Sequence, residues 1–156
     1  MLHRIPRLAT SELSDVADLL DGIGDQVTLI FDVDGTVARQ GAPHDEFSVA
    51  VNAAIDDFER HPLIDRAIAL TNGAERGVAR MISRGNKPWT SRRRLGIRGV
   101  PNLVVVGDQV LTDGVLAWRL GAVFIHLIIE GQTEPPAQVR LRRRGRWLEP
   151  LLFKQR

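Results

Sequence analysis

The chain has 156 residues, of which 44% are hydrophobic and 26% are charged, and it contains no cysteine. These values are typical of one globular domain with a buried core, and they exclude disulfide bonds and thiolate metal sites. The net charge of +2 hides an asymmetry, because residues 139–156 hold seven Arg or Lys against Glu149 alone. The first 138 residues therefore carry a net charge of −4, and the basic C-terminal segment needs an explanation.

The distribution of apolar residues bears on the location of the protein. The basic stretch at 1–7 is not followed by the apolar segment of a secretory signal. No apolar run approaches the roughly twenty residues that cross a bilayer. We therefore expect a cytoplasmic protein, which the basic segment would allow to lie at the inner face of the membrane.

The apolar pattern predicts helices that alternate with strands. Helices are expected within 1–26 and at 45–60, 74–83, 88–95 and 113–120. Strands are expected at 27–31, 64–70, 102–106 and 123–129, and a loop or small flap covers 37–45. This alternation is typical of β-α-β crossovers, so we expect an α/β fold whose parallel sheet is flanked by helices and fills residues 1–130.

Three of the expected strands end in polar residues of a particular kind, and a lysine lies between the last two. These residues are Asp32 and Asp34, Thr71, Asp108 and Asp113, and Lys87. Ligand sites of open α/β sheets lie just beyond the carboxyl ends of the strands. The pattern therefore predicts a functional site at that edge of the sheet.

The two acids after the first strand are one residue apart. Alternate residues of an extended chain point to the same side, so Asp32 and Asp34 can converge on one centre. Gly35 then lets the backbone turn away. The simpler alternative is an acidic turn that only caps the strand. We favour a site, because the later strands supply matching polar groups.

Several carboxylates beside one amine suit a divalent cation and a phosphate. Mg²⁺ prefers oxygen ligands and keeps waters and substrate phosphate around it. Asp32 and Asp108 are the natural carboxylate ligands, and the main-chain carbonyl of Asp34 is a third. Mg²⁺ and Lys87 would offset the negative charge of the carboxylates and of the phosphate.

Four motifs in order resemble those of the haloacid dehalogenase (HAD) superfamily over almost the whole chain. They are Asp32-Val33-Asp34-Gly35-Thr36, Thr71-Asn72, Lys87-Pro88, and the stretch from Gly107 to Asp113. The resemblance implies a HAD-like (Rossmannoid) fold and a phosphatase in which Asp32 forms an aspartyl-phosphate. It also implies that Asp34 protonates the leaving group and then activates water.

The same resemblance assigns the remaining site residues. Thr71, Asn72 and Lys87 would bind the phosphoryl oxygens, and Asp113 would orient Lys87 or a metal-bound water. Gly35 and Thr36 would support the site from the adjoining turn. The acid two residues after the nucleophile favours hydrolysis over the dehalogenase or ATPase chemistry of the superfamily.

A closer resemblance is to the YqeG-like HAD subfamily IIIA group, which includes phosphatidylglycerophosphate phosphatases. The residues that carry it are 105–113, Arg119-Leu120-Gly121 and the arginine-rich end of the chain. Only 34 residues separate Thr36 from Thr71 and only 15 separate Thr71 from Lys87, which leaves no room for a cap domain. An open, capless site suits a large substrate, so we expect a role in phospholipid metabolism, with phosphatidylglycerophosphate as substrate.

The segment 131–156 combines basic and apolar residues, and a helix is expected to begin near Thr133. Its basic residues are Arg140, Arg142, Arg143, Arg144 and Arg146, next to Trp147. Such a segment suits an anionic membrane surface. The alternatives are a helix that packs on the domain and a contact with the phosphates of RNA or DNA.

Two further functions stay open at this point. One is a phosphatase for a soluble small molecule or a phosphoprotein. The other is a HAD-fold binding protein that docks on RNA or the ribosome through its basic tail. A complete catalytic set argues against the second, since a binding protein does not need Asp34 and Lys87 together.

Overall fold

The computed structural model of the protein describes residues 3–23, 25–38, 42–128 and 136–154. Its elements, in order, are β1 (Arg7–Thr10), α1 (Asp15–Leu20), β2 (Val27–Asp32), α2 (His44–Glu59), β3 (Ile64–Leu70), β4 (Met81–Ile82), β5 (Leu103–Gly107), the π-helical turn η1 (Val110–Gly114), α3 (Val115–Leu120), β6 (Val123–Leu127) and α4 (Pro136–Leu152). The strands form one parallel sheet in the order β1-β6-β5-β2-β3-β4. This is an α/β fold, compatible with a Rossmann-like arrangement.

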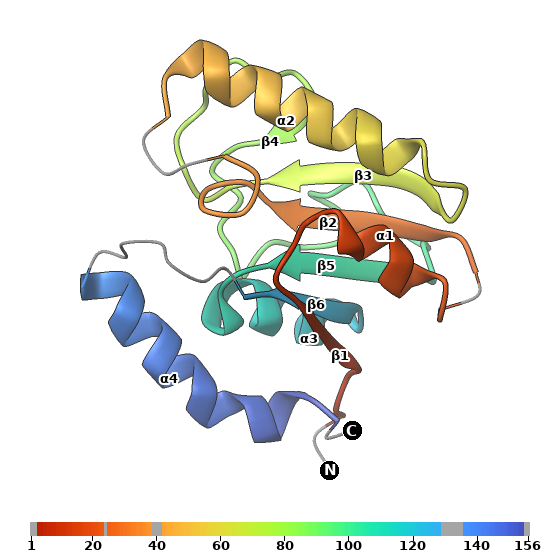
Figure 1. Ribbon diagram of the computed structural model, residues 1–156. Coiled ribbons are helices and arrows are strands. Elements are labelled where there is room, and N and C mark those ends of the chain that lie inside the picture. The colour runs from red at the N-terminus through yellow and green to blue at the C-terminus, as the bar shows by residue number, and fades with distance from the viewer. Residues whose placement is uncertain (1–2, 24, 39–41, 129–135, 155–156) are drawn as a thin grey trace.

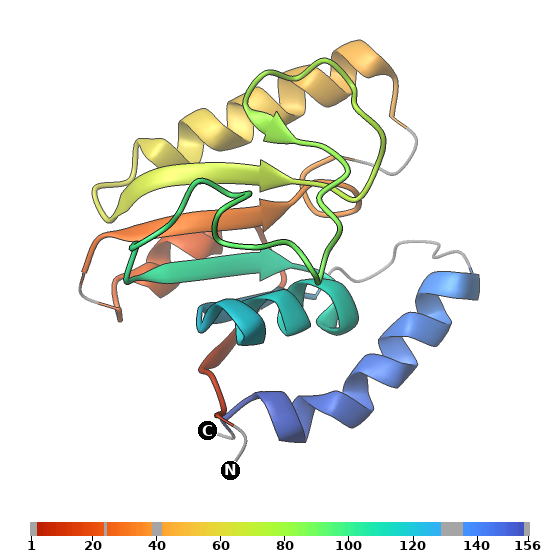
Figure 2. The same ribbon diagram turned by 180° about the vertical axis from the view of Figure 1, so that it is seen from behind.

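Alternate side chains of the strands pack on opposite faces of the sheet. In β2, Leu29 and Phe31 join a buried cluster with residues of α1 and α2. Ile30 joins the other cluster, which includes residues of α3 and the end of α4. Figures 1 and 2 show α1 on one side of the sheet and α3 on the other. The expected helix-flanked parallel sheet is therefore confirmed.

The register of the central strands determines which residues meet at the carboxyl edge. Asp32 is aligned with Leu70 of β3, and Phe31 is aligned with Val106 of β5. The residues that follow β3 and β5 therefore come to the same edge as Asp32. Thr71 and Asp108 reach the neighbourhood of Asp32 through this register alone.

Most of the strands and long helices agree with the sequence prediction. The strands expected at 27–31, 64–70 and 102–106 are β2, β3 and β5, to within one residue. The helix expected at 45–60 is α2, and the one expected at 113–120 is η1 followed by α3. The strand expected at 123–129 is β6, which ends at Leu127, and position 129 lies outside the described residues. Of the flap expected at 37–45, residues 39–41 also lie outside them.

Two predicted helices are wrong, and two strands, β1 and β4, were not predicted. The segment 74–83 forms turns with a left-handed Gly77 and ends in β4, because Met81 and Ile82 pair with the end of β3. The segment 88–95 forms turns that Arg92 ties to the carbonyls of Val100 and Leu120. β1 is a short edge strand paired with β6, within the segment 1–26 where only a helix was expected.

The expected C-terminal helix is α4, which begins at Pro136, while 129–135 lie outside the described residues. A Cβ atom on Gly145 would lie 3.0 Å from Cβ of Val110, so α4 approaches η1 closely. At its end, main-chain hydrogen bonds join Ile5 to Leu152 and to Lys154. One side of α4 therefore packs on the core, as one of the three interpretations of the tail expected.

No helix within the described ranges is long and apolar enough to cross a membrane.

The packing of α4 can be tested with two residues at its end that lie two positions apart. Phe153 is buried and stacks on Phe124 at 5.3 Å between ring centroids, whereas Leu151 is 48% exposed. We expect Phe153→Ala to lower the free energy of unfolding by about 3–5 kcal/mol, because it leaves a cavity. Leu151→Ala is the matched control and should change it by less than about 0.5 kcal/mol. Urea denaturation measures both, and equal small effects would contradict the docked position of α4.

Candidate active site

An open pocket of about 330 Å³ lies at the carboxyl edge of the sheet. Its lining residues are Asp32, Asp34, Thr71, Asn72, Gly73, Arg76, Lys87, Gln109 and Thr112. A larger hollow of about 470 Å³ lies between β1 and α4, but none of the predicted catalytic, metal-binding or phosphate-binding residues lines it. The smaller pocket is the candidate site, because the charged groups converge there.

The ammonium group of Lys87 is buried between two carboxylates. It donates a hydrogen bond to Asp32 and another, of 2.8 Å, to Oδ1 of Asp113. Asn72 holds the main chain of Lys87 through both atoms of its amide, since Oδ1 accepts from the Lys87 N–H at 2.6 Å and Nδ2 donates to its carbonyl at 3.2 Å. Arg119 donates to the carbonyl of Pro88 at 2.6 Å. The lysine is therefore fixed from several elements.

These contacts bear on two of the predicted roles. Asp113 was expected to orient Lys87, and it accepts a direct hydrogen bond from the Lys87 ammonium group. The side chain of Asn72 is engaged with the main chain of Lys87, so its observed contacts position the lysine. A direct contact between Asn72 and phosphate stays a prediction.

Asp113 fits its place because Gly107 has no side chain. A Cβ atom at position 107 would overlap with the carboxylate of Asp113. The main-chain N–H of Gln109 donates to Oδ2 of Asp113 at 3.3 Å. The glycine of the fourth motif is thus a packing requirement of the carboxylate that follows it.

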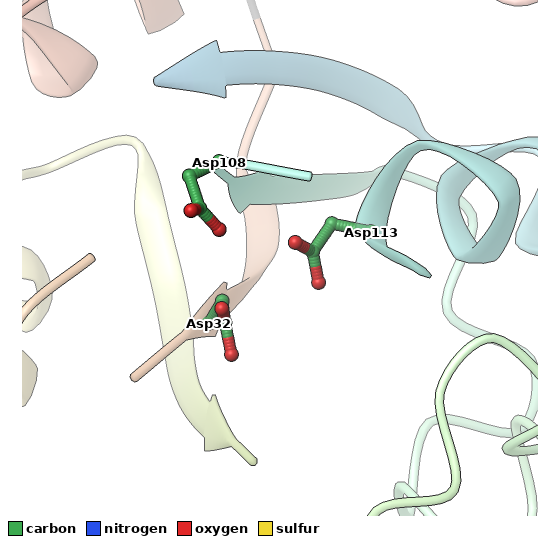
Figure 3. Close-up of side chains that lie close together, drawn as sticks. All are labelled: Asp32, Asp108 and Asp113. Carbon is green, nitrogen blue, oxygen red and sulfur yellow. The ribbon is translucent and has the colours of Figure 1, made fainter. Parts of the chain in front are cut away.

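Asp32, Asp108 and Asp113 gather at the ends of β2 and β5 and in η1. Each offers a carboxylate oxygen, and these oxygens lie within 4.8 Å of one another. Figure 3 shows the three carboxylates turned toward a shared space. This group could hold a metal ion. It contains Asp113 and not the side chain of Asp34; a ligand role for the Asp34 main-chain carbonyl stays a prediction.

The electrostatics of the cluster favour a cation. Burial raises the pKa of Asp32 to about 8, the charge of Asp113 adds to this effect, and Lys87 opposes it. The pKa of Lys87 is also raised, because the charges of Asp113 and Asp32 outweigh the effect of its burial. The three carboxylates lie close together, and Lys87 is bonded to two of them. Their oxygen atoms are the ligands that a hard divalent cation prefers.

Asp34 lies in a different environment from Asp32. The hydroxyl group of Thr71 donates to Oδ2 of Asp34 and accepts from the N–H of Gly73 at 2.8 Å. The side chain of Asp34 is 24% exposed, compared with 9% for Asp32. The two acids therefore line one pocket as expected, with Asp32 against a buried lysine and Asp34 nearer to solvent.

The remaining predicted residues surround the cluster. Gly35 has φ +85°, and a Cβ atom there would lie 3.7 Å from Oδ2 of Asp108. The hydroxyl of Thr36 is buried in the same turn.

His126 bonds through Nε2 to the carbonyl of Asp108 at 3.1 Å and through Nδ1 to Arg7 at 2.6 Å. Since a carbonyl only accepts and a guanidinium only donates, His126 carries its proton on Nε2.

Sequence reasoning missed four residues that line the pocket, namely Gly73, Arg76, Gln109 and Thr112. Gln109 and Thr112 lie inside the fourth motif, so their presence could have been inferred from its other members. Arg76 was placed on a helix that does not form. The signal that it belongs to a turn was its position between Gly73 and Gly77, directly after the end of β3.

The raised pKa of Asp32 has a measurable consequence. Without a divalent cation, the folded protein keeps a proton on Asp32 that the unfolded chain releases near pH 4, so stability falls between about pH 4 and pH 8. We expect the melting temperature to decline with pH over this range more steeply than in Asp32→Asn. An equal or shallower decline than in Asp32→Asn would contradict the assignment.

Metal addition tests the same cluster at pH 8. At a Mg²⁺ concentration ten times the dissociation constant, the melting temperature should rise by about 3–6 °C. The rise should be absent in Asp108→Asn, while a matched change in the exposed Asp65→Asn should keep it. A rise that survives in Asp108→Asn would place the cation elsewhere.

The chain matches no family model, no curated protein and no solved structure. The case for a function therefore rests on the geometry of this pocket.

Proposed function

We propose that the protein is a Mg²⁺-dependent phosphomonoester hydrolase that forms an aspartyl-phosphate on Asp32. The observation that carries the proposal is the pairing of Asp32 with the buried Lys87 in a pocket that also contains Asp34, a second acid in a different environment. A nucleophile, a cation beside it and a separate proton carrier are the groups that this reaction needs.

In the first step, a carboxylate oxygen of Asp32 attacks phosphorus, and the bond from phosphorus to the ester oxygen breaks. Asp34 gives its proton to that oxygen, so the alcohol leaves uncharged. Lys87, held against Asp32, neutralises part of the negative charge on the phosphoryl oxygens. The hydroxyl oxygen of Thr71 accepts a hydrogen bond from the N–H of Gly73. The hydroxyl proton is therefore directed at the Asp34 carboxylate and holds it in place.

In the second step, Asp34 takes a proton from water, and the water oxygen attacks phosphorus. The bond between phosphorus and Asp32 breaks, which releases phosphate and restores both acids. Asp32 and Asp108 would hold Mg²⁺, together with the main-chain carbonyl of Asp34 and with Asp113 beside them. When bound, the cation would keep Asp32 ionised and offset the charge of the phosphate.

Substitution of Asp32 tests the chemistry. Asp32→Asn keeps the size of the side chain but removes the nucleophilic carboxylate, so phosphate release from an aryl phosphate should fall at least about 1,000-fold. The exposed Asp65→Asn, at the start of β3, should leave the rate unchanged. Retained activity in Asp32→Asn, with an unchanged circular dichroism spectrum, would reject this mechanism.

The outer face of α4 supports a membrane-surface phosphate ester, such as phosphatidylglycerophosphate, as substrate. Trp147 is 81% exposed and Leu151 is 48% exposed. Arg140, Arg143 and Arg144 are exposed and recur at helical spacing around these apolar residues, while Glu149 lies on the packed side, bonded to Arg7. The exposed Arg146 lies beside this face, and the side chain of Arg142 is outside the described residues. Basic residues around an exposed tryptophan suit an anionic lipid surface.

The position of α4 agrees with such a role. Its N-terminal end lies on the side of the molecule where the strands end, in both views (Figures 1 and 2). A membrane surface bound by α4 would therefore lie on the same side of the molecule as the pocket. The open pocket could then receive a head group without a cap.

Vesicle binding tests the α4 face. Each arginine near an anionic surface contributes about 1 kcal/mol, so Arg140, Arg143 and Arg144 changed together to Gln should weaken binding about 100-fold. The vesicles contain anionic and zwitterionic lipid, and sedimentation measures the bound fraction. A matched triple change of the exposed Arg60, Arg93 and Arg98 should have little effect.

Two outcomes would replace the lipid assignment. Steep, salt-dependent RNA binding through the same arginines, without vesicle binding or phosphate release, would favour the RNA or ribosome interpretation. Phosphate release from soluble esters alone would keep the phosphatase and assign it a soluble or protein substrate.

A further inference from the structure

We infer that Arg76 forms a subsite for a second anionic group, so that the preferred substrates are phosphomonoesters whose leaving alcohol carries another phosphate or a carboxylate. This inference rests on the proposed hydrolase function, and it concerns a residue that the reaction steps do not use. A lipid phosphate whose leaving alcohol contains a phosphodiester belongs to this class.

Arg76 lies in the pocket next to the acid that would protonate the leaving group. It lines the pocket together with Asp32 and Asp34, and its Nη2 lies 3.7 Å from Oδ1 of Asp34. Lys87, by contrast, is bonded to Asp32. In the proposed reaction, Asp34 protonates the oxygen of the leaving group, so the leaving group must pass next to Asp34. Arg76 therefore faces the part of the substrate that changes from one phosphate ester to another.

The guanidinium of Arg76 is supported by the ring of Phe47. Its central carbon lies 4.2 Å from the centroid of the Phe47 ring, and Phe47 is fully buried in α2. Stacking on a fixed ring restricts the planar group without using its N–H donors. The side chain still keeps 31% of its surface exposed.

The guanidinium of Arg76 also has hydrogen-bond donors that no described residue uses. The distance of 3.7 Å to Asp34 is longer than a hydrogen bond, and Nη1 is buried without a hydrogen-bond partner among the described residues. Arg80, four residues later, has the contacts expected of a purely structural arginine, since it bonds to both Asp56 and Glu59 of α2. The guanidinium of Arg76 can therefore donate to a carboxylate or a phosphate that enters the pocket.

A charge-matched pair of substrates tests the inference. Glycerol 3-phosphate and 3-phosphoglycerate have similar size, but the second carries a carboxylate where the first has a neutral hydroxymethyl group. Wild-type kcat/KM should be at least about 10-fold higher for 3-phosphoglycerate. In Arg76→Gln this ratio should fall to about one, and Arg76→Lys should keep part of it. Arg80→Gln, the matched control, should keep the wild-type ratio.

The outcomes separate this subsite from the hydrolase proposal. Binding of the two compounds to Asp32→Asn, measured by calorimetry, should show the same preference and lose it when Arg76→Gln is added. Turnover without preference, or an Arg76→Gln variant slowed equally for both compounds, would overturn the subsite and leave the hydrolase intact. Selective binding without turnover by the wild type would reject the hydrolase and keep the anion subsite.

Discussion

The buried ammonium group of Lys87 is the feature on which the site depends. It lies between Asp32 at the end of β2 and Asp113 in η1, and it is bonded to both carboxylates. Loss of this charge would leave buried carboxylates facing one another, a change that typically costs about 3–5 kcal/mol. Asn72 and Arg119 bond to the main chain of the Lys87-Pro88 segment and thereby hold the lysine in this position.

The same arrangement separates the two acids of the first motif. Asp32 is buried beside Lys87, and a bound divalent cation would keep it ionised for attack on phosphorus. Asp34 is more exposed and is held by Thr71, which suits a group that exchanges protons with a leaving group and with water. Two carboxylates of one type can take different roles when their environments differ in this way. The spacing of one residue brings both to the pocket, and the neighbouring strands supply the difference.

The strands and helices whose positions depend on the burial of apolar residues could be predicted from the sequence. β2 and β5 are largely apolar, β3 ends in the apolar run 67–70, and the amphipathic pattern of α2 is plain. These elements were therefore predicted within a residue or two. β1 was not predicted, because a four-residue edge strand has no such run. The segment 74–83 has helix-forming residues, but Gly77 adopts φ +64° and Met81 pairs with β3, so tertiary pairing overrides the local preference.

The candidate site shows the same division. The acids and Thr71 could be placed from the residues alone, because parallel strands bring their carboxyl ends to one edge. The contact of Lys87 with Asp32 could not, since it depends on the path of a turn-rich segment, and Arg76 was missed for the same reason. That Gly107 makes room for Asp113 also becomes visible only when the two are placed side by side.

The most direct test of the account is detection of a phosphoryl group on Asp32. With an aryl phosphate, whose leaving group departs without a proton from Asp34, the Asp34→Asn variant should lose the activation of water and accumulate the aspartyl-phosphate, which acid quenching preserves for mass spectrometry. We expect one phosphoryl group per chain, located on the peptide that contains Asp32 and removed by hydroxylamine. A phosphoryl group on another residue, or steady turnover by this variant with no phosphorylated protein, would contradict the central claim.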